Sequence, residues 1–364
     1  MNLAAKLLIF ALIGSASSAM IVSENSPQDL TQLSSSVDYE HAQEDFTTAG
    51  YSVLQSFPED VVDFLWHESE GEIVVRSARK DAVRKFIGDN SSIVVSGVDS
   101  DVVSYLDRSY VEMEAITAFS DVSSFGIGAR YEWREHAVRV NFPAADQSAI
   151  WQKVQRVLES MNGYLVDSGV RVTVEFEDEN VPSQEATTGG QTYSGCTGAF
   201  VANRGAAYGI TTAAHCTTKP SSYDGDVTGS TWTSSNNYDL RYTALSGDVP
   251  TNKAYVGLPS LREINSVGIV APNITISKYG KTTGFTLSVK VLAYEGCVTY
   301  TSGDTWCSLY STDNVTAPGD SGGPWFSAFT AYGIHSGASS IKSFFTPVSF
   351  VHFISGNPSI KTSP

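Results

Sequence analysis

The sequence of 364 residues predicts two different halves, an α+β half followed by an all-β half. Two strand–helix–strand patterns occupy residues 47–179, which is typical of an α+β region. From residue 187 onward, many short apolar runs alternate with Gly, Asn and Pro turns, which indicates an all-β barrel or sandwich. Charge divides the chain at the same point. Residues 1–186 carry 13 basic and 30 acidic side chains, whereas residues 187–364 carry 10 and 9. This asymmetry predicts that the halves have different roles.

The first 20 residues, MNLAAKLLIFALIGSASSAM, have the pattern of a secretory signal peptide. Lys6 precedes an apolar core over residues 7–13, and the small residues that follow form an expected cleavage site after Ala19. The apolar core is too short to remain as a membrane anchor. We therefore expect a signal peptide over residues 1–19 and a secreted, extracellular protein that does not associate with membranes.

Residues 20–186 form the acidic α+β region. Its first part, residues 20–45, is polar and is expected to be poorly ordered. The two strand–helix–strand units then read, in order, GEIVVRSA, RKDAVRKFIG and SSIVVSGV, followed by HAVRVNFP, ADQSAIWQKVQRVLESMNG and GVRVTVEFE. The segment DENVPSQEATTGGQTYSG changes composition sharply and predicts a linker that is open to proteolysis between Asn180 and Tyr193.

All four cysteines lie in the second half of the chain, at Cys196, Cys216, Cys297 and Cys307. An even number in an exported protein predicts two disulfides, for which three pairings are open. We favour the two pairs that are local in sequence, each of which contributes about 3 kcal/mol. A zinc site is the alternative, but no Cys-x-x-Cys or paired His spacing supports it.

The segment PGDSGGPW has the features that a nucleophilic serine requires. A tight glycine turn exposes the Oγ of Ser321 and lets the N–H groups of Gly319 and Ser321 converge on a developing oxyanion. A serine needs a base, and His215 in ITTAAHC is the candidate. The base needs an orienting carboxylate. Asp239 in NNYDLRY is preferred, and Asp224 and Asp226 are rivals in YDGDVTG, a segment expected to be an exposed turn.

TAAHC together with GDSGGP resembles the chymotrypsin-like serine proteases over residues 187–364. KYGKTTG and FFTPVSFV narrow the resemblance to the streptogrisin and α-lytic protease group. It implies an all-β catalytic domain of two antiparallel six-stranded barrels. It also implies that residues 20–186 are a pro-region that acts as an intramolecular chaperone and then as an inhibitor. In that group an internal arginine pairs with the aspartate before the nucleophile, so Lys278 is expected to pair with Asp320, although lysine lacks the bidentate geometry.

The same resemblance predicts the specificity pocket, which three segments build in this fold: the run before the nucleophile, the strand after it and a third that closes the base. Thr316 and His335 match pocket residues of glutamyl endopeptidases. Both can donate to a carboxylate that loses its hydration on entering the pocket. The backbone of Ser336, Gly337 and Ala338 is expected to pair with an extended substrate. Ala338 departs from the streptomycete glutamate-specific type, which has a serine there.

These residues predict a serine endopeptidase that acts on proteins or peptides, with preference for Glu. The alternatives are an apolar pocket in which His335 is structural, a catalytically silent homologue that acts as a binding protein, and an esterase. No motif implies a cofactor or metal, and the acidic first half argues against nucleic acid as a partner. We expect a monomer. If the enzyme is glutamate-specific, the Glu185–Ala186 bond is a candidate for self-processing.

Overall fold

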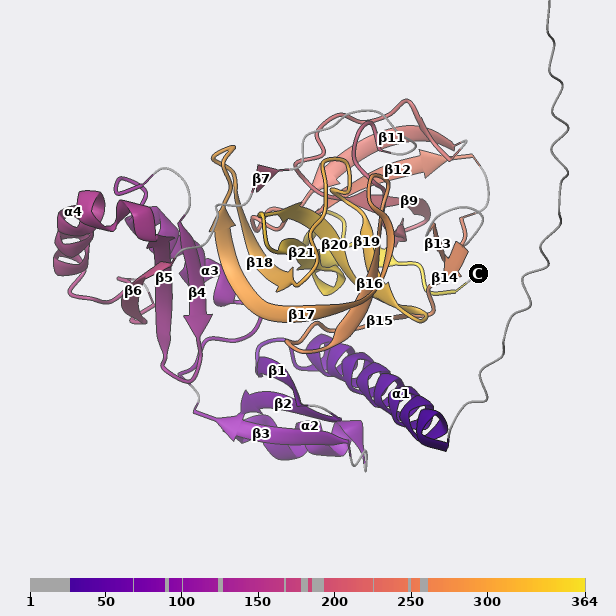
Figure 1. Cartoon of the computed structure of the whole chain (residues 1–364), viewed down its shortest axis with the longest axis horizontal. Helices are drawn as coiled ribbons and strands as arrows, with labels where there is room; N and C mark the ends of the chain where they lie inside the picture. Colours follow the sequence, from indigo (N-terminus) through magenta and orange to yellow (C-terminus); the bar gives the residue numbers. More distant parts are fainter. Residues whose placement is uncertain are drawn as a thin grey trace, which may run out of the picture. The chain divides into compact units, whose positions relative to one another are not determined.

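The structure is a computed structural model (Figure 1). It describes residues 27–363 apart from 68, 89–91, 100, 124–126, 167, 178–182, 185–192, 225, 248–249 and 256–260. The predicted signal peptide and the Glu185–Ala186 bond lie outside the described residues. Residues 39–364 form one compact unit, and residues 1–38 are assigned to another. None of the helices in the described ranges is long and apolar enough to cross a membrane.

The N-terminal region contains both predicted strand–helix–strand units. Its elements are α1 (Pro27–Ser56), β1 (Val61–His67), β2 (Glu70–Arg76), α2 (Lys80–Ile87), β3 (Ile93–Val98), α3 (Arg108–Ala118), β4 (Gly128–Glu132), β5 (Ala137–Pro143), α4 (Gln147–Ser160), β6 (Arg171–Glu177) and β7 (Ser183–Gln184). Strands β2 and β3 are parallel and joined through α2, and β5 and β6 are parallel and joined through α4. The α+β prediction for this region is therefore confirmed.

Helix α1 corrects the expectation that residues 20–45 lack order, because residues 27–45 belong to it. Polar composition was misleading here, since buried polar side chains of α1 hydrogen-bond to groups that are distant in sequence. The Gln43 amide donates to the Thr275 carbonyl at 2.9 Å and accepts from the Thr275 N–H at 2.8 Å. Thr47 Oγ1 lies 2.7 Å from the Tyr332 hydroxyl. Satisfied polar groups can be buried without a large cost.

The second half is all-β, as predicted. Its strands are β8 (Val201–Arg204), β9 (Ala207–Thr212), β10 (Ser222–Tyr223), β11 (Asp226–Thr233), β12 (Arg241–Ser246), β13 (Lys253–Tyr255), β14 (Leu261–Glu263), β15 (Ser266–Val267), β16 (Thr275–Gly280), β17 (Gly284–Thr299), β18 (Thr305–Thr312), β19 (Pro324–Ser327), β20 (Thr330–Ala338), β21 (Ser343–Pro347) and β22 (Ser359–Ile360). One six-stranded sheet has the order β10-β11-β12-β9-β8-β22. Asp226, expected in an exposed turn, lies in β11 of this sheet.

A second set of strands closes on itself. The order β16-β19-β20-β21-β18-β17 is antiparallel throughout, and β17 also pairs with β16. Closure removes the exposed edges of these six strands. The strand that follows the predicted nucleophile, β20, belongs to this ring and is buried along its whole length.

The N-terminal region continues the sheet of the second half through β4, which pairs with the long strand β17 (Figure 1). Ala129 of β4 lies opposite Cys297, and Gly128 lies opposite Val298. Helix α3 packs beside this junction and buries two charged side chains. Arg108 is 2% exposed and pairs with Asp63 at 2.9 Å. Sequence patterns did not predict this shared sheet, because strand pairing between distant segments depends on tertiary register.

Glu112 of α3 is the second buried charge, and its environment makes stability depend on pH. The side chain is 0% exposed, and its carboxylate accepts from the Tyr131 N–H at 3.0 Å and the Tyr294 hydroxyl at 3.1 Å. Burial raises the pKa of Glu112 to about 7, although these two donors, Arg108 and Arg130 act in the opposite direction. A raised folded-state pKa favours folding at low pH and loses that advantage as pH rises toward 7.

We therefore expect Glu112→Gln to flatten the pH dependence of unfolding. Both chains carry Ser321→Ala, so that self-cleavage cannot interfere with the measurement. Near pH 5 the two chains should differ little, because Glu112 is protonated when folded. Above pH 8 the Gln chain should have the larger free energy of unfolding, by up to about 3 kcal/mol. Urea unfolding at several pH values measures this, and parallel profiles for the two chains would contradict it.

Candidate active site

The loop that carries Ser321 is held in a conformation that only glycine accommodates at two positions. Gly319 has φ +102° and Gly322 has φ +82°. A Cβ on Gly322 would lie 1.9 Å from Thr212 Oγ1, so the turn also excludes larger residues sterically. The Thr197 hydroxyl donates to the Gly319 carbonyl at 2.8 Å, and its N–H donates to the Ser321 carbonyl at 2.7 Å. These bonds fix the predicted nucleophile between the two sheets of the second half.

His215 and Asp239 are in direct contact. His215 Nδ1 lies 2.7 Å from Asp239 Oδ2, and the His215 N–H donates to Asp239 Oδ1 at 3.0 Å. The Ser336 hydroxyl also donates to Asp239 Oδ2, at 2.6 Å. Asp239 is 0% exposed, so these donors replace the hydration that its charge loses. The Ser321 hydroxyl donates to the Ser336 carbonyl at 3.4 Å. Strand β20 thus meets both the carboxylate and the predicted nucleophile.

The rival carboxylates are placed elsewhere. The Asp226 carboxylate accepts a hydrogen bond from the Tyr208 hydroxyl at 3.1 Å. Asp224 is exposed, with φ +50°. His215 instead contacts Asp239 through both its backbone N–H and its Nδ1.

The four cysteines form two disulfides, Cys196–Cys216 and Cys297–Cys307, which are the two pairs that are local in sequence. Within the described residues, one group of potential metal ligands stands out: His215 with Cys196 and Cys216. Because both sulfurs belong to a disulfide, neither can supply the thiolate that zinc prefers. The residues present do not fit the zinc alternative at this position.

Lys278 and Asp320 meet in the interior beneath the nucleophile loop. Their side chains are 2% and 1% exposed, and Lys278 Nζ lies 3.1 Å from Asp320 Oδ2. The N–H groups of Thr282 and Thr283 donate to Asp320 Oδ1 at 2.9 and 3.1 Å. Burial alone would raise the pKa of Asp320, but Lys278 and the Thr283 hydroxyl hold it below its ordinary value. The ion pair fixes the residue that directly precedes Ser321.

Thr316 and His335 also meet, although 19 residues separate them in the sequence. Thr316 Oγ1 lies 3.0 Å from His335 Nε2, and the His335 residue is 2% exposed. The ring of Trp325 packs against the imidazole, with centroids 6.1 Å apart. Strand β21 supplies a further hydroxyl that sequence reasoning missed. Ser343 Oγ donates to the Asn314 carbonyl at 2.6 Å and lies 3.1 Å from Thr316 Oγ1.

Ser343 could be assigned to the pocket only from knowledge of which strands lie beside β21. A third segment was predicted to close the base of the pocket, and no residues were assigned to it. Strand β21 pairs with β20 on one side and β18 on the other, which brings Ser343 opposite Ala338 and beside Thr312. No local motif marks a lone serine in SFFTP as a pocket residue, because pairing register alone decides which strand neighbour it has.

The predicted substrate-binding backbone of β20 carries a partner strand. Gly337 pairs with Gln184, and Ala338 pairs with Ser183, in antiparallel register. The partner strand, β7, belongs to the predicted linker in which proteolytic processing is expected. A segment of the N-terminal half therefore occupies the edge of β20 where an extended peptide is expected.

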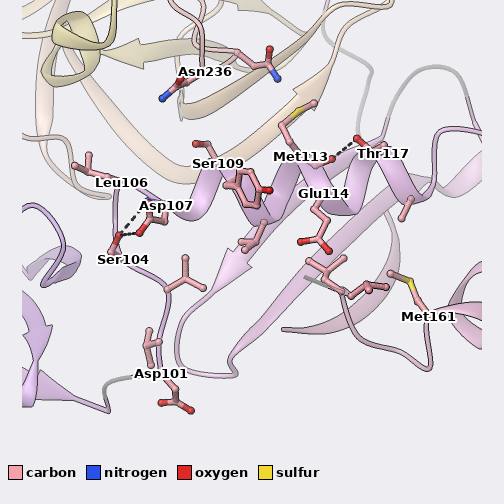
Figure 2. Close-up of a pocket in the computed structure, with 18 of the residues that line it drawn as sticks. Asp101, Ser104, Leu106, Asp107, Ser109, Met113, Glu114, Thr117, Met161 and Asn236 are labelled. Carbon is pink, nitrogen blue, oxygen red and sulfur yellow. Dashed lines mark hydrogen bonds between the residues drawn. The ribbon is translucent and has the colours of Figure 1, made fainter. Parts of the chain in front are cut away.

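A separate cleft of about 1220 Å³ lies beside α3, where Figure 2 shows Asn236 across from the helix. Its lining includes Asp107 and Glu114 of the N-terminal region and Asn236 of the second half. None of Ser321, His215 or His335 lines it. Residues of both halves line this cleft, and the predicted catalytic residues lie elsewhere.

The chain is similar in sequence to known proteins. The family model described as Trypsin matches residues 171–354. Glutamyl endopeptidase 2 of Streptomyces griseus is 35% identical over 162 residues, which cover 42% of this chain and 84% of the relative. Serine protease 2 of Streptomyces fradiae is 30% identical over 150 residues, covering 37% and 80%.

Solved structures also match. One is described as a glutamic acid specific serine protease that utilizes a novel histidine triad in substrate binding. It is 28% identical, with a TM-score of 0.38, and covers 42% of this chain and 87% of that chain. Thermobifida fusca Protease A is 21% identical, with a TM-score of 0.41, and the match covers 49% and 98%. The family model spans half of the sequence, and the chain belongs to the trypsin family of chymotrypsin-like serine proteases.

Proposed function

We propose that this chain is a secreted serine endopeptidase, made as a pre-pro-protein, that cleaves peptide bonds after Glu. The observation that carries the proposal is the contact of Thr316 Oγ1 with His335 Nε2 at 3.0 Å, in a trypsin-family chain whose His215 is paired with Asp239. Residues 1–19 would be the signal peptide, 20–186 the pro-region and 187–364 the catalytic domain.

In the proposed mechanism, Ser321 attacks the scissile carbonyl. His215 takes the proton of the serine hydroxyl and later gives it to the leaving amine. Asp239 keeps the Nδ1 proton on His215 and stabilises the imidazolium that forms. The N–H groups of Gly319 and Ser321 would bind the oxyanion of the tetrahedral intermediate. The N–H of Asp320, which lies between them in sequence, already donates to the Ala317 carbonyl at 3.0 Å.

The proposed specificity rests on the donors available to a buried carboxylate. A glutamate side chain that enters the pocket loses hydration worth several kcal/mol, which hydrogen bonds must replace. The Thr316 hydroxyl and the His335 imidazole can each donate one bond, and a charged imidazole donates most strongly. Ser343 Oγ, which donates its one proton to the Asn314 carbonyl at 2.6 Å, lies 3.1 Å from Thr316 Oγ1 and adds a polar oxygen beside the threonine. The relative named Glutamyl endopeptidase 2 supports the same specificity.

Self-processing at the Glu185–Ala186 bond follows from the same specificity. Gln184 lies opposite Gly337 in an antiparallel pairing. A substrate that pairs with β20 in this register would have its next residue near Ser336 and His335. The residue that follows Gln184 in the sequence is Glu185. The pro-region would then present its own end as the first substrate, and the product would inhibit the site until it dissociates.

Two alternatives remain distinct from this proposal. In an enzyme that prefers large apolar residues, His335 would bond only to Thr316 and would not read charge. A silent homologue would lack acyl-transfer chemistry, but the pairing of His215 with Asp239 favours an active enzyme. Fluorophosphonate labelling of Ser321 separates active from silent, and hydrolysis of a protein separates a protease from an esterase.

We expect digestion of an unfolded protein to give products that end almost entirely in Glu. Mass spectrometry of the products maps the cuts, and the same instrument reads the N-terminus of the mature enzyme. Ala186 is the expected first residue, and Ser321→Ala should leave the chain uncut. Cuts after Phe, Tyr or Leu would refute the specificity. A mature enzyme that begins elsewhere would remove only the self-processing step.

A further inference from the structure

Tyr300 is a buried tyrosine next to the end of β17 whose hydroxyl lies behind the proposed triad. Its side chain is 0% exposed, and its oxygen lies 3.0 Å from Ser336 Oγ. Ser336 Oγ in turn lies 2.6 Å from Asp239 Oδ2. Neither the sequence motifs nor the pocket residues discussed above include Tyr300.

The direction of these bonds follows from counting protons. Ser336 has a single hydroxyl proton, and an ionised Asp239 can only accept. At 2.6 Å the serine proton therefore lies toward the carboxylate, which leaves Ser336 Oγ as the acceptor for its other neighbour. Tyr300 must then donate its own proton to Ser336. The bonds run in one direction, from Tyr300 to Ser336 to Asp239, where they meet the bond from His215 Nδ1.

We infer that Tyr300 is a positioning residue for the proposed triad, acting through Ser336 on Asp239. The inference rests on the triad assignment made above. A hydroxyl that accepts one hydrogen bond becomes a better donor in the next. Tyr300 thus strengthens the bond that Ser336 gives to Asp239 and holds the serine rotamer that gives it. With Ser336 fixed, Asp239 Oδ2 keeps a constant geometry toward His215.

The chain around Tyr300 is built to hold this position. The Tyr300 N–H donates to the Asp304 carbonyl at 2.8 Å, and its carbonyl accepts from the Gly303 N–H at 2.9 Å, which closes a tight turn. The Cys297–Cys307 disulfide joins the two strands that lead into this turn. The ring of Phe344 packs edge-on against the Tyr300 ring, with centroids 6.4 Å apart. The turn, the disulfide and the packing of Phe344 therefore together fix the position of the Tyr300 hydroxyl.

The test is Tyr300→Phe in the mature enzyme, which removes the hydroxyl and retains the ring. We expect kcat on a Glu peptide to fall about 5- to 10-fold, the effect of one hydrogen bond, with KM little changed. The acid limb of the kcat/KM profile should also move to higher pH. With weaker bonding from Ser336, more of the Asp239 charge is available to stabilise the His215 imidazolium.

The matched control is Tyr193→Phe. Tyr193 is also 0% exposed, and its hydroxyl contacts Thr243 Oγ1 within the proposed catalytic domain rather than Ser336. Its pH profile should equal that of the parent. A Tyr300→Phe enzyme with a parental kcat, or with a lower kcat and a parental acid limb, would overturn the inference and make Tyr300 only a packing residue.

A second variant keeps the inference testable if Tyr300→Phe folds poorly. Ser336→Ala removes the link through which Tyr300 is inferred to act, so Tyr300→Phe should lower kcat no further in that background. An equal loss in both backgrounds would contradict action through Ser336. Failure of the triad itself is a different result, because Asp239→Asn would then retain activity whatever Tyr300 does.

Discussion

Asp239→Asn is expected to lower kcat by about 10⁴-fold with little change in KM. The carboxylate in the parent enzyme accepts a hydrogen bond from His215 Nδ1 at 2.7 Å. The proton therefore stays on Nδ1, and Nε2 carries the lone pair that takes the serine proton. An asparagine amide turned toward Nδ1 as a donor would reverse this tautomer and place the proton on Nε2. The Ser336 hydroxyl, at 2.6 Å from the same oxygen, adds to the cost because it would face an N–H₂ group or force the amide to rotate.

The measurement requires a mature enzyme, which an inactive variant cannot make for itself. The parent enzyme is therefore used to cleave the variant chain in trans and is then removed. Asp226→Asn is the matched control, because Asp226 is a rival carboxylate that accepts a hydrogen bond from the Tyr208 hydroxyl. It should retain kcat within about twofold. Activity of Asp239→Asn within tenfold of the parent would contradict the triad assignment. A large loss of activity in Asp226→Asn would indicate that Asp226 is the carboxylate that orients His215.

His335→Ala is expected to lower kcat/KM for Glu peptides by about 100-fold and to leave Phe peptides unchanged. The substitution removes the imidazole that lies 3.0 Å from Thr316 Oγ1 and leaves a single hydroxyl to replace the hydration of the substrate carboxylate. Loss of one charge-assisted hydrogen bond to a buried carboxylate costs about 2–3 kcal/mol, which corresponds to this factor. The loss should be specific to acidic side chains, since apolar ones gain nothing from a donor.

His352→Ala is the control for general effects of removing a histidine. His352 is half-buried near the end of the chain, and its Nδ1 bonds to the Ser349 carbonyl at 2.7 Å. Its removal should lower stability slightly without changing the ratio of Glu to Phe cleavage. If both histidine variants lowered all substrates equally, the effect of His335 would be structural.

The predictability of the site differed between its parts. Ser321 and His215 lie in local motifs from which the sequence predicts them as triad residues, and the cysteine pairs are the two that are local in sequence. The choice of Asp239 was a choice among three aspartates that differ in burial. Asp239 is 0% exposed, Asp226 is half-buried and Asp224 is exposed. The contacts of Tyr300 and Ser343 could not be predicted, because each depends on which strand lies beside which.

The fold was predicted where side-chain periodicity reflects burial. Strand β5 and helix α4 were recognised because their apolar residues follow periods of 2 and 3.6, at Val138, Val140 and Phe142 in the strand and at Ile150 and Val154 in the helix. Strand β11 was missed because DVTGSTWT is polar and largely exposed. The part of α1 before Phe46 was missed for a similar reason, since Gln43 is a buried polar residue whose partner, Thr275, is 232 residues away in sequence.

The measurement that tests the central claim most directly is a peptide panel that varies only the residue on the acyl side of the scissile bond. Glu, Asp, Phe, Leu, Ala and Arg suffice, with kcat/KM determined for the mature parent and for His335→Ala. The account predicts a maximum at Glu in the parent that collapses in the variant, while the other peptides keep their rates. A maximum at Phe or Leu that is indifferent to the substitution would contradict it and make His335 a structural histidine.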